Sequence, residues 1–373
     1  MKLTIPHLII VMFIFFTANF SSVLPCTTFV LRSSNHLLFC RNLDWYTGSG
    51  ILITNQKNIE KTACIDSAQN PVKWISKYGS ITFNQVGRDL PFGGMNETGL
   101  VVEHMSLSNT SYPPEDERPA IQACQWIQFQ LDNYSTINEV INSDKILRIV
   151  DANSNFHFLV CERSGKAASI EFLNGKMICH SGDDLPVEAL ANSTYEESLS
   201  CYKKITEPGD NVSLNNFFKA AQMVNNFEFA NIESDIEYAF KTLSMVSQGV
   251  FTKWSIVYDI TNMKVYFKIF ETPKVAGKQI IFLNVPGTAK VKSVDIRGFD
   301  FSCSNTSKVI DLDIDKEGSV NEFFTDYSTA INKEFIVKAF SFFRKMGVLV
   351  KISDDDLDKL SKYPETFKCA AKD

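Results

Sequence analysis

The sequence of 373 residues has few of the groups that a metal site or a nucleotide site requires. It contains five histidines, with His7 inside an N-terminal apolar segment, and no Cys-x-x-Cys pair, so a zinc site is poorly supported. A P-loop, a Gly-x-Gly-x-x-Gly stretch and a Gly-x-Ser-x-Gly stretch are all missing. The net charge of −6 is spread along the chain, which argues against nucleic acid as a partner. We therefore expect no metal, no cofactor and no nucleic-acid partner.

The composition is that of a folded globular protein, with 45% hydrophobic and 21% charged residues. The length fits one large domain, or one domain with an appendage. No internal repeat and no low-complexity tract is visible in the sequence. The 30 phenylalanines suit a large hydrophobic core or an apolar pocket.

The first 25 residues differ from the rest of the chain. Lys2 precedes an apolar run over residues 8–16, which would span about 14 Å as a helix at about 1.5 Å per residue. A bilayer core needs roughly 20 apolar residues, and no second stretch of that length occurs, so we expect no membrane span. The basic start and short apolar run are typical of a secretory signal peptide, with a buried N-terminal helix as the alternative. We assign residues 1–25 to a signal peptide and short pro-segment, and expect an exported protein, whether secreted, periplasmic or lumenal.

If the protein is exported, its cysteines can form disulfides, because the compartment outside the cytoplasm is oxidising. An odd number of cysteines leaves at least one thiol unpaired within the chain. Lipidation of Cys26 is a minor alternative, since Pro25 stands where a lipoprotein box has a small residue. The nine cysteines are Cys26, Cys40, Cys64, Cys124, Cys161, Cys179, Cys201, Cys303 and Cys369.

Strand-like and helix-like patterns alternate along the chain. Runs that favour strands, including an early and a late hairpin, cover residues 27–32, 36–45, 51–55, 99–105, 156–161, 167–172, 254–258 and 264–270. Helices are predicted over residues 121–131, 215–224, 238–246 and 321–346, and after a capping box that begins at Thr136. A second capping box, which begins at Ser234, precedes the predicted helix over residues 238–246. This order, with antiparallel hairpins, predicts an α+β layered domain rather than a doubly wound one.

Cys26 begins the first predicted strand, and the return strand of the hairpin carries Arg41 and Asp44. In a short hairpin these two side chains come back beside Cys26, where Arg41 would favour the thiolate and Asp44 would hold an ammonium group. Taken alone, Cys26 is more simply half of a disulfide, and Arg41 with Asp44 an ion pair in a turn. The three residues also fit a nucleophile beside two groups that order it, and at this point both interpretations stay open.

Six stretches together resemble the choloylglycine hydrolase and penicillin V acylase family of cysteine N-terminal-nucleophile hydrolases. They follow the family's order and spacing from Cys26 to about Asp311, and they are Cys26-Thr27-Thr28, Arg41 to Trp45 (RNLDW), Gly94 to Leu100 (GMNETGL), Gln125 to Asn133 (QWIQFQLDN), Ala191 to Ser193 (ANS) and Trp254 to Asp259 (WSIVYD). The resemblance implies an α+β fold, a four-layer αββα sandwich, over residues 26–315. Residues 316–373 would form a helical C-terminal extension. The resemblance also implies a homo-oligomer, namely a tetramer.

The activity that the resemblance implies is hydrolysis of a linear amide, a small-molecule substrate. Removal of everything before Cys26 exposes an α-amine, with a reference pKa of about 7.7–8.0, that serves as general base for the thiol. The thiolate attacks the amide carbonyl, the amine leaves, and water hydrolyses the thioester. Arg41 and Asp44 match the family's pair that orders the N-terminal residue. Asn192 matches its oxyanion donor, a contribution worth roughly 3–4 kcal/mol.

Two positions depart from the family pattern. Ser106 stands where bile-salt members carry a second oxyanion Asn and penicillin members a Tyr, so its hydroxyl or a backbone amide would have to donate. Asn216, before Phe217, stands where the family has an Arg, so a positive charge near the site is lost. With Trp45 beside the catalytic strand, Ser106 and Asn216 are candidates for substrate binding or for the oxyanion hole.

The acyl group and the type of activity stay open at this point. Trp45 and the missing Arg favour phenoxyacetyl or medium-chain acyl amides, such as penicillin V or acyl-homoserine lactones, over conjugated bile salts. Acid-ceramidase-like lipid amidases are an alternative, because they also begin with a Cys-Thr strand and an Arg-Asn-Leu-Asp return. An inactive, secreted, disulfide-bonded binding protein is the alternative from another class. A free N-terminal Cys26 thiol distinguishes the enzyme from that binding protein.

Overall fold

The computed structural model describes residues 25–33, 35–150, 154–204, 209–270, 274–276, 279–281, 289–345 and 353–371. The predicted signal peptide, apart from Pro25, lies outside the described residues. Within the described ranges, no helix is long and apolar enough to cross a membrane.

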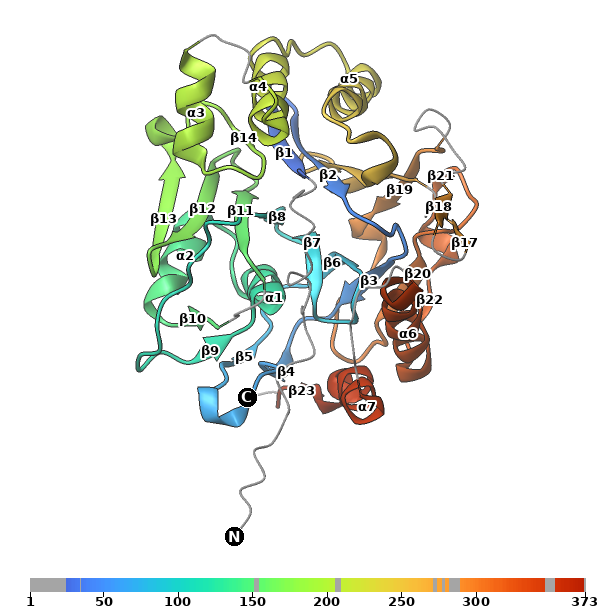
Figure 1. The fold of residues 1–373 in the computed structure, drawn as a ribbon. Helices are drawn as coiled ribbons and strands as arrows, with labels where there is room; N and C mark the ends of the chain where they lie inside the picture. Colours follow the sequence, from blue (N-terminus) through green and yellow to red (C-terminus); the bar gives the residue numbers. More distant parts are fainter. Residues whose placement is uncertain are drawn as a thin grey trace.

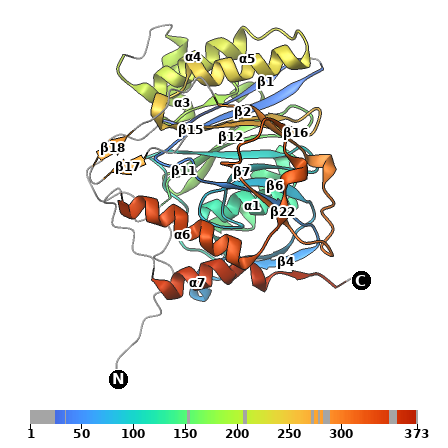
Figure 2. The same ribbon diagram turned by 90° about the vertical axis from the view of Figure 1, so that its right-hand side faces the viewer.

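Two β-sheets stacked on each other form the middle of the molecule (Figures 1 and 2). The first sheet has seven strands, in the order β14 (Ala189–Leu190), β1 (Thr27–Arg32), β2 (Leu37–Asp44), β15 (Thr252–Asp259), β16 (Lys264–Ile269), β19 (Lys292–Asp295) and β21 (Gly318–Ser319). The second sheet has nine strands, in the order β13 (Lys176–Ser181), β12 (Ala167–Leu173), β11 (Phe156–Cys161), β8 (Val101–Ser106), β7 (Pro91–Asn96), β6 (Ser80–Asn84), β3 (Ile51–Asn55), β20 (Lys308–Asp311) and β22 (Thr325–Asp326).

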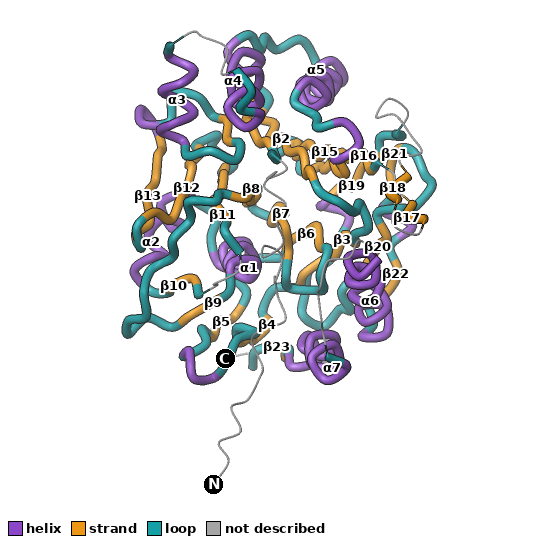
Figure 3. Tube along the Cα trace, in the orientation of Figure 1, coloured by secondary structure: helices purple, strands orange, loops and turns teal. Residues whose placement is uncertain are grey.

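Helices cover the outer sides of both sheets, as the purple segments around the orange strands show in Figure 3. The first sheet is covered by α4 (Val212–Asn225) and α5 (Ile232–Met245), with α3 (Tyr195–Lys203) packed beside α4. The second sheet carries α1 (Ala123–Asn133), followed by α2 (Ile137–Asn142). The remaining long helices, α6 (Thr329–Lys345) and α7 (Asp354–Lys362), pack on each other. The layer order confirms the predicted αββα sandwich.

Smaller sheets complete the described structure. They are formed by β9 (Ala120–Ile121) with β10 (Arg148–Ile149), by β17 (Lys274–Ala276) with β18 (Gln279–Ile281), and by β4 (Ile59–Thr62) with β5 (Lys73–Ile75) and β23 (Lys368–Cys369).

The hydrophobic core lies between the sheets and beneath the helices. Every residue of β2 and of β15 is buried, because one face of these strands meets the helices and the other meets the second sheet. Strand β16 instead shows a period of two, since Val265 and Phe267 are buried while their neighbours are partly exposed. The position of β2 and β15 matters for the site, because charged side chains on these strands are necessarily buried.

Local sequence signals explain most helix starts. The capping box predicted at Thr136 is present, with Glu139 bonded back to the cap backbone. The prediction of a capping box at Ser234 is wrong. Helix α5 begins earlier, at Ile232, and Asn231 is its N-cap, accepting a hydrogen bond from the backbone N–H of Ser234.

The predicted C-terminal extension, residues 316–373, contains short strands as well as helices. The helix predicted over residues 321–346 begins only at Thr329, because β22 (Thr325–Asp326) precedes it. Strand β21 pairs with β19 of the first sheet, β22 pairs with β20 of the second, and β23 pairs with β4. A disulfide joins Cys303 to Cys369. The Tyr363 hydroxyl donates to the Thr62 carbonyl at 2.9 Å. Within the described residues, the extension is therefore attached to the rest of the protein at several separate points.

Candidate active site

Cys26 lies directly before β1, between the ends of two neighbouring strands. In the antiparallel register, Thr28 of β1 lies opposite Arg41 on one side and Leu190 on the other. Two residues earlier, Cys26 therefore lies level with the end of β2 and with the residue that follows β14 by two positions, Asn192. The Cys26 side chain is 5% exposed, and its thiol donates to the backbone carbonyl of Asp44 with an Sγ–O distance of 3.8 Å.

The environment of Cys26 keeps its thiol protonated. Burial raises the pKa of the Cys26 thiol to about 11, while the buried Arg41 guanidinium lowers it through its charge and a hydrogen bond, and the Asp44 carboxylate raises it. A base must therefore remove the proton before the sulfur can attack. The Cys26 nitrogen forms a peptide bond with Pro25 here, and a peptide nitrogen is not a base.

Asp44 offers a buried acceptor atom beside Cys26. Its Oδ1 accepts a hydrogen bond from the Thr252 hydroxyl, but its Oδ2 has no hydrogen-bond partner among the described residues. Burial raises the pKa of Asp44 to about 7. Hydrogen bonds from the Thr252 hydroxyl and the Gln248 backbone N–H lower this pKa, but they only partly offset burial. The positive charges of Arg41 and Lys253 act in the same direction as these hydrogen bonds. An unsatisfied buried acceptor is costly, so Asp44 is suited to accept a hydrogen bond from a further donor.

Lys253 is a residue of this region that the sequence analysis missed. It lies on β15, is 1% exposed, and donates from Nζ to the Val250 carbonyl at 2.6 Å. Burial lowers the pKa of Lys253 to about 8, although Asp44 opposes the shift. A lysine at the start of an apolar strand usually lies in solvent, so the sequence gives no sign that Lys253 is buried. Its burial follows from the structure, in which every residue of β15 is buried. Lys253 is thus a second positively charged side chain near Asp44, besides Arg41. The region therefore keeps a second positive charge even though Asn216 stands where an Arg was expected.

Asn192 and Ser106 are brought together by the fold. The Asn192 side-chain amide donates from Nδ2 to the Ser106 backbone carbonyl at 2.7 Å, and the Asn192 backbone N–H donates to the Ser213 hydroxyl at 2.8 Å. Ser106 thus contributes its carbonyl here. An amide nitrogen carries two N–H groups, so this bond fixes the Asn192 side chain and leaves one N–H for another acceptor.

Asn216 lies beside Pro25, the residue that directly precedes Cys26. It is buried on α4, and its Nδ2 lies 3.1 Å from the Val246 carbonyl and 3.5 Å from the Pro25 carbonyl. The Gln248 amide donates to its Oδ1 at 3.4 Å. Asn216 therefore contacts the residue directly before Cys26, close to the position that the sequence analysis gave it.

Trp45 begins an aromatic edge next to Asp44. Its backbone N–H donates to the Phe251 carbonyl at 2.7 Å. The ring of Tyr46 lies 5.5 Å from the ring of Trp45 and 6.1 Å from that of Phe251, in edge-to-face geometry. Three aromatic side chains thus lie close to the end of β2, where an apolar substrate group could pack.

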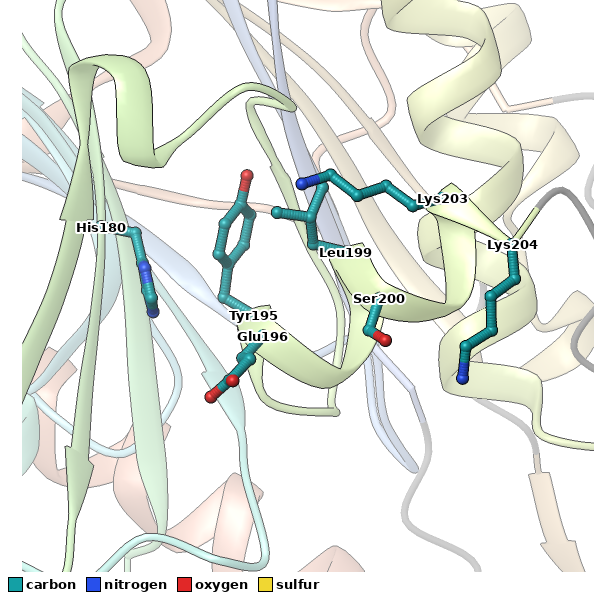
Figure 4. A pocket seen from close by; sticks show the side chains of 7 residues that line it. All are labelled: His180, Tyr195, Glu196, Leu199, Ser200, Lys203 and Lys204. Atoms are coloured by element: carbon teal, nitrogen blue, oxygen red, sulfur yellow. The ribbon is translucent and has the colours of Figure 1, made fainter.

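One open cleft of about 450 Å³ lies elsewhere, beside α3 (Figure 4). It is lined by His180, Tyr195, Glu196, Leu199, Ser200, Lys203 and Lys204. The sequence-predicted site residues do not line this cleft. In the part of the chain that the structure describes, no group of three or more His, Cys, Asp or Glu side chains is placed to hold a metal ion.

Comparison with known proteins identifies the family. The family of linear amide C–N hydrolases called the choloylglycine hydrolase family matches residues 26–206. A penicillin V acylase from Pectobacterium atrosepticum is 24% identical over 306 residues, which cover 68% of this chain and 80% of that protein.

Solved structures share the fold. A penicillin V acylase from Agrobacterium tumefaciens is 25% identical with a TM-score of 0.67, and the match covers 81% of this chain and 98% of that one. A conjugated bile acid hydrolase from Clostridium perfringens is 16% identical with a TM-score of 0.60, covering 79% and 99% of the two chains. The chain therefore belongs to the choloylglycine hydrolase family, and it is a hydrolase of linear amides with the N-terminal-nucleophile fold.

Proposed function

We propose that this protein is an exported amidase whose mature chain begins at Cys26 and whose nucleophile is the Cys26 thiol. The observation that carries the proposal is the meeting of three groups at one end of the first sheet: the Cys26 thiol, the unsatisfied Asp44 carboxylate oxygen and the Asn192 amide. Cys26 then supplies both the nucleophile, through its thiol, and the base, through its α-amine.

The proposed reaction has two halves. The α-amine of Cys26 takes the thiol proton, and the thiolate attacks the carbonyl carbon of the substrate amide. The C–N bond breaks, the ammonium group returns the proton to the leaving amine, and a thioester remains on Cys26. Water, deprotonated by the same amine, then cleaves the thioester and releases a carboxylic acid.

Neighbouring residues have separate roles in this proposal. Asp44 holds the ammonium group through its unsatisfied Oδ2, and Arg41 offsets part of the effect of burial on the Cys26 thiol. Asn192 donates its remaining N–H to the oxyanion that forms in both halves of the reaction. Ser106 supports Asn192 through its backbone carbonyl.

Maturation must break the Pro25–Cys26 peptide bond, since only then is the α-amine free. The contact between Asn216 and the Pro25 carbonyl supports a place for this bond inside the site. Signal peptidase would cut a few residues earlier, and the protein itself would remove the remaining pro-segment. The Cys303–Cys369 disulfide is compatible with the oxidising compartment that export implies.

The proposed substrate is an amide with an apolar or aromatic acyl group. Two penicillin V acylases are among the relatives, and Trp45, Tyr46 and Phe251 supply aromatic surface beside the nucleophile. We rank phenoxyacetyl and medium-chain acyl amides, including acyl-homoserine lactones, above conjugated bile salts. By the same family resemblance we propose a homo-oligomer, a tetramer, which light scattering on the purified protein would test.

A substrate panel tests the proposed function. The purified mature protein is assayed with penicillin V, a medium-chain acyl-homoserine lactone, glycocholate and an N-acylethanolamine, with the Cys26→Ala variant as a matched control. We expect the highest kcat/KM on one of the first two substrates and no turnover by the variant. A glycocholate value tenfold above both would overturn the substrate ranking, and turnover by Cys26→Ala would overturn the mechanism. N-acylethanolamine as the best substrate would favour the lipid-amidase alternative.

A further inference from the structure

A buried ion pair joins the strand that carries Arg41 to the second sheet. The Arg41 Nη1 atom lies 2.6 Å from Glu103 Oε2, and both side chains are fully buried. Arg41 also donates to two backbone carbonyls, from Nη1 to Phe92 and from Nη2 to His104, each at 3.2 Å. Arg41 belongs to β2 and the other three residues to β7 and β8, so this cluster links the sheets directly behind Cys26.

Residues on neighbouring strands fix the position of the Glu103 carboxylate. The Tyr258 hydroxyl, from β15, donates to Glu103 Oε1. Gly93 lies opposite Glu103 on β7, and a Cβ atom at that position would lie 2.0 Å from the Glu103 carboxyl group. Any side chain larger than hydrogen at position 93 would therefore displace the carboxylate from Arg41. A buried ion pair adds little net stability, because desolvation offsets the attraction, so stability alone explains this arrangement poorly.

We infer that Glu103 is a positioning residue for the reaction, one that fixes the Arg41 guanidinium beside Cys26 and balances its positive charge. This inference rests on the proposed function of Cys26 as the nucleophile. Glu103 itself has no contact with the substrate in this scheme, because it acts through Arg41.

The charge balance matters because an N-terminal nucleophile needs a thiol and an amine of matched basicity. An uncompensated guanidinium would hold the sulfur as a thiolate, and a thiolate of low pKa is a weaker nucleophile. The same uncompensated charge would also lower the pKa of the α-amine from its reference value of about 7.7–8.0, so less of the amine would carry the proton that the leaving group needs. With its charge shared by Glu103, Arg41 orders the thiol without fully ionising it.

Few other ionisable groups face this cluster. Asp44 and Arg41 act on the Cys26 thiol, and Asp44 is itself faced by Lys253. Arg41 and Tyr258 act on Glu103, where burial raises the pKa of the carboxyl group to about 7 and Arg41 opposes the shift.

His104 lies beside Phe92, and its Nδ1 donates to the Phe92 carbonyl at 2.6 Å. Burial lowers the pKa of His104 well below its usual range, and the Arg41 charge adds to that shift, so its imidazole is neutral. Glu103, in direct contact with Arg41, and the more distant Asp44 are therefore the carboxylates that compensate Arg41 in the alkaline range where the thiol titrates.

The test follows the ionisation of Cys26 directly. Mature protein is treated with iodoacetamide between about pH 6 and pH 12, a range that covers the reference pKa of the α-amine and the pKa of about 11 of the Cys26 thiol. The alkylated N-terminal peptide is quantified by mass spectrometry. We expect the alkylation midpoint of Glu103→Gln to lie about one pH unit below that of the wild type, because a nearby negative charge has been removed. Tyr258→Phe removes a hydrogen bond but no charge, so it should move the midpoint much less.

A second variant separates position from charge, and it also covers the case in which Glu103→Gln does not fold. Glu103→Asp keeps the charge but shortens the reach to Arg41. We expect a midpoint close to that of the wild type, with a fall in kcat on penicillin V and little change in KM. An unchanged midpoint in Glu103→Gln, or an equal shift in Tyr258→Phe, would overturn the charge role. Wild-type kcat in Glu103→Asp would overturn the positioning role. The same spectra show whether the peptide begins at Cys26, so failure of the proposed function is seen separately.

Discussion

Asn192 donates its side-chain amide to the backbone carbonyl of Ser106, across 2.7 Å and from a different part of the chain. This bond fixes the direction of the amide before any substrate arrives, which is what an oxyanion donor requires. We predict that Asn192→Ala lowers kcat about 10²–10³-fold, the usual effect of removing one oxyanion donor, and changes KM little. Steady-state kinetics on penicillin V give both constants. A variant with altered KM and normal kcat would assign Asn192 to substrate binding.

Ser106→Ala is the matched comparison for that experiment. It removes the hydroxyl but keeps the backbone carbonyl that accepts the Asn192 bond. We expect its kcat to stay far closer to that of the wild type than the kcat of Asn192→Ala. A fall as large as that of Asn192→Ala would show that the Ser106 hydroxyl also donates to the oxyanion.

We expect Asp44 to contribute to catalysis through its negative charge. Asp44→Asn keeps an oxygen for the Thr252 hydroxyl but loses the carboxylate that would hold the N-terminal ammonium group. We expect kcat/KM to fall about 10²–10⁴-fold, the contribution of a correctly held general base, while the melting temperature changes little. Thr252→Ser, which keeps the hydroxyl, is the control and should retain most of the activity. Near-normal activity in Asp44→Asn would remove Asp44 from the mechanism.

Activity should require a chain that begins at Cys26. We predict that intact-mass analysis of active protein shows no residue before Cys26, and that Cys26→Ala is inactive and keeps any pro-segment that self-processing would remove. The reason is that Pro25 consumes the α-amine in a peptide bond, so no base is available. The measurement is N-terminal sequencing combined with an activity assay of the same sample. Turnover by a chain that still carries Pro25 would contradict the proposed mechanism.

His36 should make stability depend on pH. It lies between two buried carboxylates, with Nδ1 2.8 Å from Asp235 and Nε2 3.2 Å from Asp259. Burial acts to lower the pKa of His36, but these two partners outweigh it, so the pKa is raised in the folded state. Its contribution is therefore complete below the unfolded pKa of about 6.5 and is lost as the pH rises through the folded pKa.

The prediction is that stability falls above about pH 6.5, measured as urea unfolding midpoints at a series of pH values. His36→Asn should cost about 3 kcal/mol at the acidic end of the series, the cost of breaking a buried pair, and should flatten the pH dependence. His180→Asn changes a histidine on β13 that lies away from this pair, and it should keep the wild-type slope. An unchanged slope in His36→Asn would refute the assignment.

The sequence predicted the first hairpin and its chemistry because the signals are local. Cys26, Arg41 and Asp44 lie within 19 residues of one another, and a two-stranded hairpin brings them together without help from the rest of the chain. Strands β1, β3 and β11 match the predicted ranges for the same reason, since their patterns are short and clear. The prediction of Asn192 as a site residue depended on the family resemblance. Asn192 comes beside Cys26 only because β1 pairs with β14, which lies more than 160 residues later in the chain.

Glu103 and Lys253 could not be found in the same way. Each is a charged residue in an apolar strand, a pattern that usually places the charge in solvent. Their burial depends on how the two sheets stack and on what covers β15, which no local pattern records. The two-residue strands β21 and β22 were missed because so short a segment has no period to detect. Asn231, rather than Ser234, caps α5, because both residues suit the cap and only packing decides between them.

The Cys303–Cys369 disulfide should stabilise the chain without affecting the chemistry. The bond closes a segment with a sequence separation of 66 that includes α6 and α7, and it lies outside the elements that form the site. Loop-closure entropy for a segment of that size corresponds to about 4 kcal/mol. We predict that the double variant Cys303→Ser and Cys369→Ser loses about this much stability and keeps its kcat below its melting temperature. Reductant should destabilise the wild type but not this variant, and Cys179→Ser, which alters a free cysteine, should match the wild type. Thiol titration of the denatured, unreduced protein decides the pairing: seven thiols fit the bond, and nine would exclude it.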